Sequence, residues 1–283
     1  MNIYTKENLE TNGYMIAKGL FSKEQVDILK LEYELIWLRL IKEGKVSLEK
    51  ENPIASLYPR LRDYHQESDT IKKQILSPRL VRTVEELIEE ESLVVSTSYY
   101  FKGPGVQGLP DHQDNFAIGA APGTTCSAWI SLDSSYPANG GLYFYKGSHK
   151  LGLLPPIRRL DNIQESFSDY GQMSLLPDNY EKVYLSTEPG DVVIFSGDTV
   201  HGSLKNETAH TFRRALLVHF AGVGLERLIL NFNNLIDRNG NRVRRRLNTT
   251  PKITENHGSI FAVTEGNYYG NNGWTRSKTK SNE

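Results

Sequence analysis

The chain has 283 residues, of which 38% are apolar and 24% are charged, and its formal net charge is −1. This composition is that of a globular protein with a sizeable core, and its balanced charge argues against a nucleic-acid or other polyanionic partner. The single cysteine, Cys126, excludes an internal disulfide and a thiolate metal cluster, so any metal would depend on imidazole and carboxylate ligands.

We expect residues 1–283 to form one elaborated domain. Its N-terminal part, about 1–91, is predicted to be helical, a β core follows over about 92–222, and a less regular extension covers 223–283, with the last dozen residues disordered. No stretch approaches the roughly 18 apolar residues that span a bilayer, so we expect a cytoplasmic protein without membrane association.

The N-terminal part contains two helical patterns. An apolar stretch at 13–17 predicts a strand, and Ser22 is a suitable N-cap for an amphipathic helix that ends at Gly44. The apolar positions of that helix are Val26, Leu29, Leu31, Leu35, Ile36, Leu38, Leu40 and Ile41. A second helix is predicted over about 77–91, with Pro78 in its first turn, where the missing N–H costs nothing.

Beyond Glu91 the segments become short and rich in β-branched and aromatic residues, and turn-forming residues separate them. This texture predicts strands, and their regular spacing without intervening helices favours an antiparallel barrel or sandwich with an internal cavity. The predicted strands are 92–103, 124–133, 141–147, 181–187, 191–197 and 213–222. The segment 152–179 is long for a loop and is interpreted as a lid or insertion.

Three residues form a candidate metal site. His112 and Asp114 are two positions apart, so their side chains leave the same face of an extended segment. Strand pairing can bring His201, which follows the apolar run 191–197, opposite His112. Two imidazoles and one carboxylate would hold iron(II) on one face and leave the other open for oxygen. The competing interpretation is a turn histidine beside a solvated aspartate.

The other histidines have more ordinary interpretations. His149 is expected to hydrogen-bond backbone in a turn, and His219, inside an apolar strand, is expected to be a satisfied core residue. His65, His210 and His257 lie in polar surroundings and are expected at the surface.

A 2-oxoglutarate co-substrate would chelate the iron and leave a distal carboxylate for an arginine to bind. Arg213 and Arg214 are adjacent, and only one of them can point inward from a strand. Ser203 shares the face of His201 and could donate a second hydrogen bond. The alternative for the arginine pair is a basic patch on an edge strand.

In order and spacing, several segments together make the sequence recognisable: HQD at 112–114, AWISLD at 128–133, NGGLYFYKGSH at 139–149, GDVVIFSGDTVHGS at 190–203, Asn206 and FRRAL at 212–216. Over about 13–222 the chain resembles the phytanoyl-CoA dioxygenase family of iron(II)- and 2-oxoglutarate-dependent oxygenases.

The resemblance implies a double-stranded β-helix, or jelly-roll, core with flanking helices. It also implies that His112, Asp114 and His201 bind iron and that Arg213 anchors 2-oxoglutarate. It places Ser203, Trp129 and Ser98 around the co-substrate. His149 falls in a structural turn, where Lys146 replaces the family's usual proline before GSH.

The reaction that the resemblance implies is hydroxylation of a C–H bond in a small-molecule metabolite, with O2 consumed and succinate and carbon dioxide released. Asp114 favours hydroxylation over halogenation, because related halogenases have a small residue there. Desaturation, cyclisation, epoxidation and peroxidation stay open. Substrate contacts are predicted for Tyr99, Tyr100, Asn115, Phe116, Arg158 and Arg159.

Two other classes of function are compatible with the same residues. One is a jelly-roll protein that binds metal without turnover, as a sensor or scaffold, and the other is an isomerase or hydrolase that uses a different divalent metal. The basic run 242–246 has two interpretations, a docking site for a phosphate or carrier protein and a solvated surface.

Overall fold

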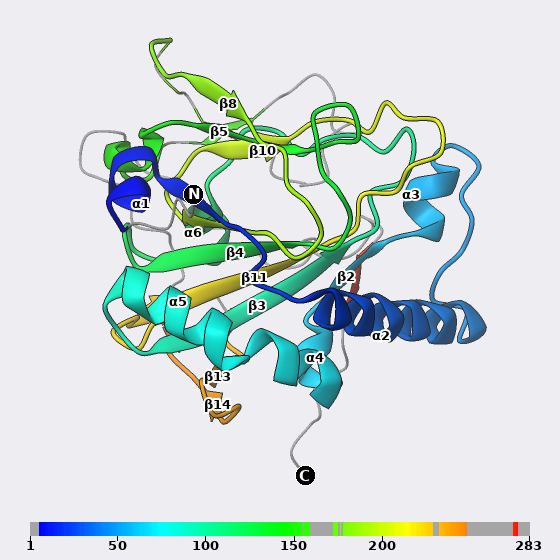
Figure 1. The fold of residues 1–283 in the computed structure, drawn as a ribbon, viewed down its shortest axis with the longest axis horizontal. Helices are drawn as coiled ribbons and strands as arrows, with labels where there is room; N and C mark the ends of the chain where they lie inside the picture. The colour runs from blue at the N-terminus through cyan, green and yellow to red at the C-terminus, as the bar shows by residue number, and fades with distance from the viewer. Residues whose placement is uncertain are drawn as a thin grey trace.

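The computed structural model describes residues 6–154, 156–158, 172–174, 176, 178–228, 232–247 and 274–276, and Figure 1 shows its layers. A large sheet lies between a helical layer and a smaller sheet. Neighbouring strands of the large sheet are hydrogen-bonded to each other. In spatial order they are β1 (Tyr14–Ala17), β9 (Val192–Ser196), β4 (Thr125–Ser131), β11 (Ala215–Gly222), β3 (Ser92–Tyr100), β13 (Leu235–Asp237) and β14 (Arg242–Val243). β2 (Arg60–Arg62) also pairs with β3, and β16 (Trp274–Arg276) pairs with β2.

The smaller sheet contains β10 (His201–Ser203), β5 (Leu142–Tyr145) and β8 (Lys182–Tyr184), and two further pairs join β6 (Pro156–Arg158) to β7 (Gln172–Ser174) and β12 (Arg227–Leu228) to β15 (Arg246–Leu247). The large sheet is open, with β1 at one edge. The prediction of a mainly β, jelly-roll-like fold with flanking helices is confirmed.

The helices are α1 (Lys6–Asn12), α2 (Lys23–Lys42), α3 (Pro53–Leu57), α4 (Asp69–Ile75), α5 (Pro78–Ile88) and α6 (Asp114–Ile118), with 3-10 turns at Tyr64–Gln66 and Ser148–Leu151. α2 and α5 correspond to the two predicted helices. Ser22 caps α2 in a reciprocal capping box with Gln25. None of the helices in these ranges combines the length and apolar character that a bilayer span needs.

Successive side chains along the strands of the large sheet point to opposite faces, so the sheet has an apolar layer on each face. On one face of the large sheet, Ala128, Ile194 and Val218 belong to a core that includes residues of α2, α4 and α5. On the other face, Trp129 and Phe195 pack with Leu142 and Phe144 of the smaller sheet. The second layer leaves room between the sheets for the cavity described below.

Two predictions concern segments that are described only in part. Of the predicted lid, the structure describes β6, β7 and a few neighbouring residues, and Arg159 lies outside the described residues, as does the side chain of Arg158. Of the last dozen residues, it describes only the backbone of Trp274–Arg276, which pairs with β2.

Candidate functional site

His112 and His201 lie opposite each other on antiparallel backbone segments. The amide of each donates to the carbonyl oxygen of the other, at 2.9 and 3.0 Å. This pairing brings the centres of the two imidazole rings to 4.2 Å. The predicted juxtaposition of two histidines 89 positions apart is therefore confirmed in the backbone itself.

The hydrogen bonds of both rings define which nitrogen can bind a metal. Nδ1 of His112 lies 2.7 Å from the carbonyl oxygen of Pro110, and Nδ1 of His201 lies 2.9 Å from that of Thr199. A carbonyl oxygen only accepts, so each Nδ1 carries hydrogen, and Nε2 is the nitrogen left to bind a metal. Burial, followed by the neighbouring His112, lowers the pKa of His201 to about 4, which keeps this ring neutral at pH 7.

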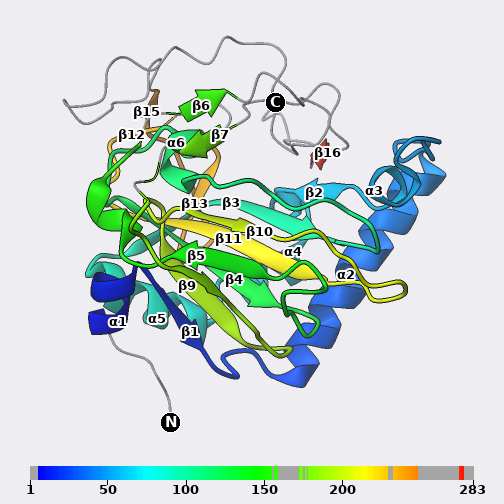
Figure 2. The same ribbon diagram turned by 90° about the horizontal axis from the view of Figure 1, so that it is seen from above.

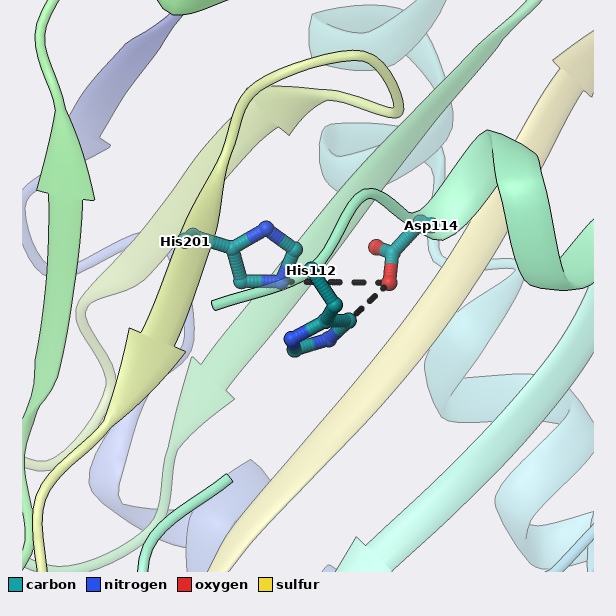
Figure 3. A group of neighbouring side chains, drawn as sticks. All are labelled: His112, Asp114 and His201. Carbon is teal, nitrogen blue, oxygen red and sulfur yellow. Dashed lines mark ion pairs between the residues drawn. The ribbon is translucent and has the colours of Figure 1, made fainter. Parts of the chain in front are cut away.

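Asp114, the first residue of α6, completes the group (Figure 3). Its Oδ1 lies 3.7 Å from Nε2 of His112 and 3.8 Å from Nε2 of His201. Its Oδ2 accepts a hydrogen bond of 2.7 Å from Ser127 and lies 3.5 Å from Nδ1 of His219. Burial raises the pKa of Asp114, but the three histidines and Ser127 outweigh it and lower the pKa to about 2. The carboxylate is therefore ionised.

The donor set of His112, Asp114 and His201 fits iron(II). The potential ligand atoms all lie within 4.8 Å of one another. Two neutral imidazoles and one carboxylate form the facial arrangement that non-haem iron(II) oxygenases use, in which the remaining coordination positions stay open. Since Oδ2 of Asp114 is already engaged, Oδ1 is the oxygen directed at the shared position.

Arg213 lies deeper in the protein, just before β11. Its side chain is almost fully buried, Nη2 donates to the carbonyl of Gly140 at 2.7 Å, and the guanidinium carbon lies 5.2 Å from the ring centre of Trp129. Nε has no hydrogen-bond partner among the described residues. A buried guanidinium that keeps an unsatisfied donor is suited to bind a carboxylate.

Lys102 brings a second buried cation to the same place. Its Nζ donates to Ser203 Oγ at 2.9 Å, and Ser203 Oγ also accepts from the Leu109 amide at 3.0 Å. Burial, followed by the charge of Arg213, lowers the pKa of Lys102 well below its usual range. Two basic side chains and a hydroxyl thus form a candidate anion site, in which the sequence analysis missed Lys102. The alternation of side chains along a strand could have indicated Lys102, because residues two apart, such as Tyr100 and Lys102, face the same side.

One cavity joins the metal group to the anion site. Its walls include the three candidate metal ligands together with Lys102, Ser203, Arg213 and Trp129. Tyr100, Ile118 and Phe232 line the rest of the cavity, with Arg60 and Arg62. The Arg60 guanidinium lies 4.9 Å from the ring centre of Tyr100 and donates to Ser98. The arrangement can hold a metal and an anion in one enclosed space.

Comparison with known families decides the classification. A family model described as "Phytanoyl-CoA dioxygenase (PhyH)" matches residues 9–215. The chain belongs to the phytanoyl-CoA dioxygenase family. The family consists of iron(II)- and 2-oxoglutarate-dependent oxygenases, so the family and cofactor class expected from the sequence are confirmed.

Individual relatives of this phytanoyl-CoA dioxygenase family member are distant. Phytanoyl-CoA dioxygenase 1 of rice is 31% identical over 156 residues, which are 55% of this chain and 54% of that protein. The peroxisomal phytanoyl-CoA dioxygenase of mouse is 26% identical over 241 residues, covering 77% of this chain and 69% of that protein. The matched region thus spans about half the length of the rice and Arabidopsis relatives.

Solved structures show the same fold at low identity. The carbocyclase SnoK from nogalamycin biosynthesis, described as α-ketoglutarate-dependent, has a TM-score of 0.62 at 20% identity and covers 80% of this chain and 86% of its own. The epimerase SnoN, solved with Fe3+, α-ketoglutarate and nogalamycin RO, has a TM-score of 0.60 at 17% identity, covering 82% and 84%.

Several predicted site residues lie elsewhere in this family member. Ser98 is fully buried beneath Arg60 and is not a cavity-lining residue. Asn115, in α6, donates to Asp198 and accepts from Thr125, which ties α6 to β4 and to the turn before β10. Phe116 packs against Leu153. The substrate or co-substrate contacts predicted for these three side chains are therefore not supported by their positions.

Tyr99 was also predicted to touch substrate, but its ring stacks on Tyr33 in the core on the opposite face of the sheet. Tyr100 does line the cavity. The two neighbours differ because consecutive strand residues face opposite sides.

Among the described residues, the remaining histidines lie outside the metal group and differ in burial. His149 contacts the carbonyl oxygen of Glu10 and lies outside the metal group, as predicted. His65 is fully buried against Thr97, so its predicted surface position was wrong, whereas His210 is exposed. His257 lies outside the described residues. His219 is buried and bonded to Ser127, as expected of a core residue, but it also lines the cavity.

Arg214 points away from the cavity and binds Asp133 and Glu34. The neighbouring Arg213 lines the cavity, as the resemblance implied.

In the basic run 242–246, Arg242 and Arg246 are exposed, and Arg245 donates to the carbonyl of Val223. These positions agree with a solvated surface, and the docking role stays a prediction.

Proposed function

We propose that this chain is an iron(II)- and 2-oxoglutarate-dependent oxygenase that hydroxylates an unactivated C–H bond of a small-molecule metabolite. The observation that carries the proposal is one cavity that contains both sites. At its centre, two imidazoles and a carboxylate place potential ligand atoms within 4.8 Å of one another. Beyond it lies an anion site whose charges come from Lys102 and Arg213.

The chain's own residues divide the work between anchoring and orientation. Lys102, Ser203 and Arg213 would hold the distal carboxylate of 2-oxoglutarate, because two basic side chains and a hydroxyl offer the charge-assisted hydrogen bonds that a carboxylate accepts. Trp129 and Leu217 form apolar walls of the same cavity, which exclude water from the co-substrate. Bound iron, with 2-oxoglutarate and oxygen, would supply the oxidation of the C–H bond, together with succinate and carbon dioxide as products.

Electrostatics support the same assignment. Lys102 and Arg213 are almost fully buried, and the distal carboxylate would offset part of the unfavourable burial of these two basic groups. Asp114 would bring one negative charge to a bound divalent ion, which would keep one net positive charge. This charge would attract the 2-oxo acid end of the co-substrate. An isomerase or hydrolase without 2-oxoglutarate has no need for such an anion site.

The decisive test is anaerobic addition of iron(II) and 2-oxoglutarate to the purified protein. The chelated complex should give a weak visible charge-transfer band. His201→Ala should lose the band, and Arg213→Met should need much more 2-oxoglutarate to reach it. Arg214→Met is the matched control, because the adjacent guanidinium faces away from the cavity. A folded wild-type protein without the band would contradict the proposal.

The type of oxidation can be assigned by coupling succinate release to product mass across a metabolite panel. Hydroxylation adds one oxygen atom, whereas desaturation and cyclisation remove two hydrogens. SnoK and SnoN, which share the fold, are described as a carbocyclase and an epimerase, so cyclisation and epimerisation, which leaves the mass unchanged, are the second candidates. A metal-binding protein without turnover would show the band and release no succinate with any metabolite.

A further inference from the structure

Helix α2 presents an apolar stripe to solvent. Leu31, Leu35 and Leu38 are 58%, 53% and 53% exposed, and their spacing places them on one face of the helix. The opposite face packs into the core through Val26, Leu29, Tyr33, Ile36 and Leu40. In Figures 1 and 2, α2 lies at the periphery of the molecule, so this face is directed outward.

The stripe is a concentration of apolar surface and not a scatter of single residues. Nine large apolar side chains are exposed in the described part of the chain, and four of them, the three leucines and Ile41, lie on α2. Leu38 also lines an adjoining groove whose walls include Trp37, Tyr136 and Phe212. Contiguous apolar patches of this kind mark interaction sites.

The charges at the two ends of the stripe are complementary to each other. Glu24 lies in the first turn of α2 and Lys42 in the last turn, on the same side as the leucines. Two pairs of these residues lie at equal distances on either side of position 33. Glu24 corresponds to Lys42 and Leu31 to Leu35, while the counterpart of Leu38 is the half-buried Ile28.

This symmetry specifies a partner. If a second copy of α2 packs antiparallel across a two-fold axis at the level of Tyr33, each Glu24 meets a Lys42 and each Leu31 meets a Leu35. The helix dipole also favours these two charges, but it does not account for the exposed leucines between them. A parallel arrangement would place like charges opposite each other.

We propose that α2 is the contact surface of a homodimer of this chain, formed by antiparallel packing of the two α2 helices. The interface has an apolar centre of leucines and a charged pair at each end. Its formation depends neither on metal nor on 2-oxoglutarate, so it is independent of the proposed oxygenase activity.

Sedimentation velocity on the full chain over a range of concentrations tests the proposal. The wild type should dimerise, and Leu31→Ser with Leu35→Ser should raise the dimer Kd by roughly tenfold or more. Leu48→Ser is the matched control, because Leu48 is 65% exposed but lies outside α2. Circular dichroism verifies folding. A monomeric wild type, or a dimer insensitive to the leucine changes, would overturn the proposal.

Charge exchange tests the antiparallel register separately. Glu24→Lys and Lys42→Glu should each weaken the dimer, because each puts like charges together at both ends. The variant that carries both changes restores the opposite charges and should dimerise like the wild type. If the single changes weaken the dimer and the combination does not recover it, the antiparallel arrangement is wrong.

Discussion

The Lys102 ammonium and the Arg213 guanidinium share one end of the cavity, with Ser203 bonded to the lysine. Both cations are almost fully buried, and the charge of Arg213 contributes to the lowered pKa of Lys102. Such a pair costs stability unless an anion joins it. The two residues therefore connect co-substrate binding to the stability of the protein.

Replacing Lys102 with Met should separate these two effects. The variant should bind 2-oxoglutarate more weakly, by roughly tenfold or more, because a charge-assisted hydrogen bond is lost. Without ligand it should melt at a higher temperature, because a buried cation has been replaced by an apolar side chain of similar shape. Calorimetric titration and thermal unfolding measure the two effects. Lys205→Met, at an exposed position, is the control and should change neither the 2-oxoglutarate affinity nor the melting temperature. An unchanged 2-oxoglutarate affinity in Lys102→Met would refute the assignment of Lys102 to the anion site.

The affinity for 2-oxoglutarate should increase as pH falls. The pKa of Lys102 is lowered in the free protein, and a bound carboxylate favours the protonated amine. Binding must therefore take up a proton at pH values between the pKa of Lys102 in the free protein and its higher pKa in the complex, and across this range the affinity increases as the pH falls. Titrations of the iron(II)-loaded protein in buffers of different ionisation enthalpy count the protons. The difference between wild type and Lys102→Met isolates this residue from the histidines.

Ser127→Ala should weaken metal binding without unfolding the protein. Ser127 donates to Oδ2 of Asp114 and so directs Oδ1 toward the two imidazoles. Loss of such an orienting hydrogen bond typically costs ten- to a hundredfold in metal affinity. Anaerobic iron(II) titration provides the measurement. Ser131→Ala is the control, since Ser131 lies on the same strand and face but bonds to Thr187. Equal affinities in both variants would exclude this role for Ser127.

Tyr143 and Tyr145 should stabilise the loop that carries His112. Their hydroxyls donate to the two carboxylate oxygens of Asp111, at 2.6 and 2.9 Å, and so tie the residue before His112 to β5. Each Tyr→Phe change should lower the free energy of unfolding by about 1–2 kcal/mol and speed amide exchange around His112. Denaturant unfolding and hydrogen exchange check this expectation, with the exposed Tyr184→Phe as the reference. No change in loop exchange would contradict it.

Local patterns were sufficient to predict the long elements. Ser22 and Gly44 bracket α2, and the apolar, β-branched runs locate β3, β4, β9 and β11. Short elements such as β2 and β10 escaped, because three residues carry too little periodicity and tertiary pairing defines them. The apolar residues of α2 were recognised, but their division between a buried and an exposed face depends on how the helix docks.

The site shows the same division. His112, Asp114, His201 and Arg213 follow from residue type, spacing and family pattern. Lys102 was not predicted in this way, because its role arises from its burial next to Arg213, which is distant in sequence. Asn115 and Phe116 do not line the cavity, because proximity in sequence to a metal ligand does not fix where a side chain points. Both follow Asp114 within α6, whose turn directs them into the protein.

The mutual backbone hydrogen bonds of His112 and His201 have a consequence for metal selection. The pairing of two chain segments, and not the ion, holds the imidazoles side by side. A site assembled in this way offers the same donors to every divalent ion, and intrinsic affinities then favour copper, nickel and zinc over iron. Occupancy by iron would depend on which ions the cell makes available. We therefore expect the metal content of the isolated protein to follow that of the growth medium.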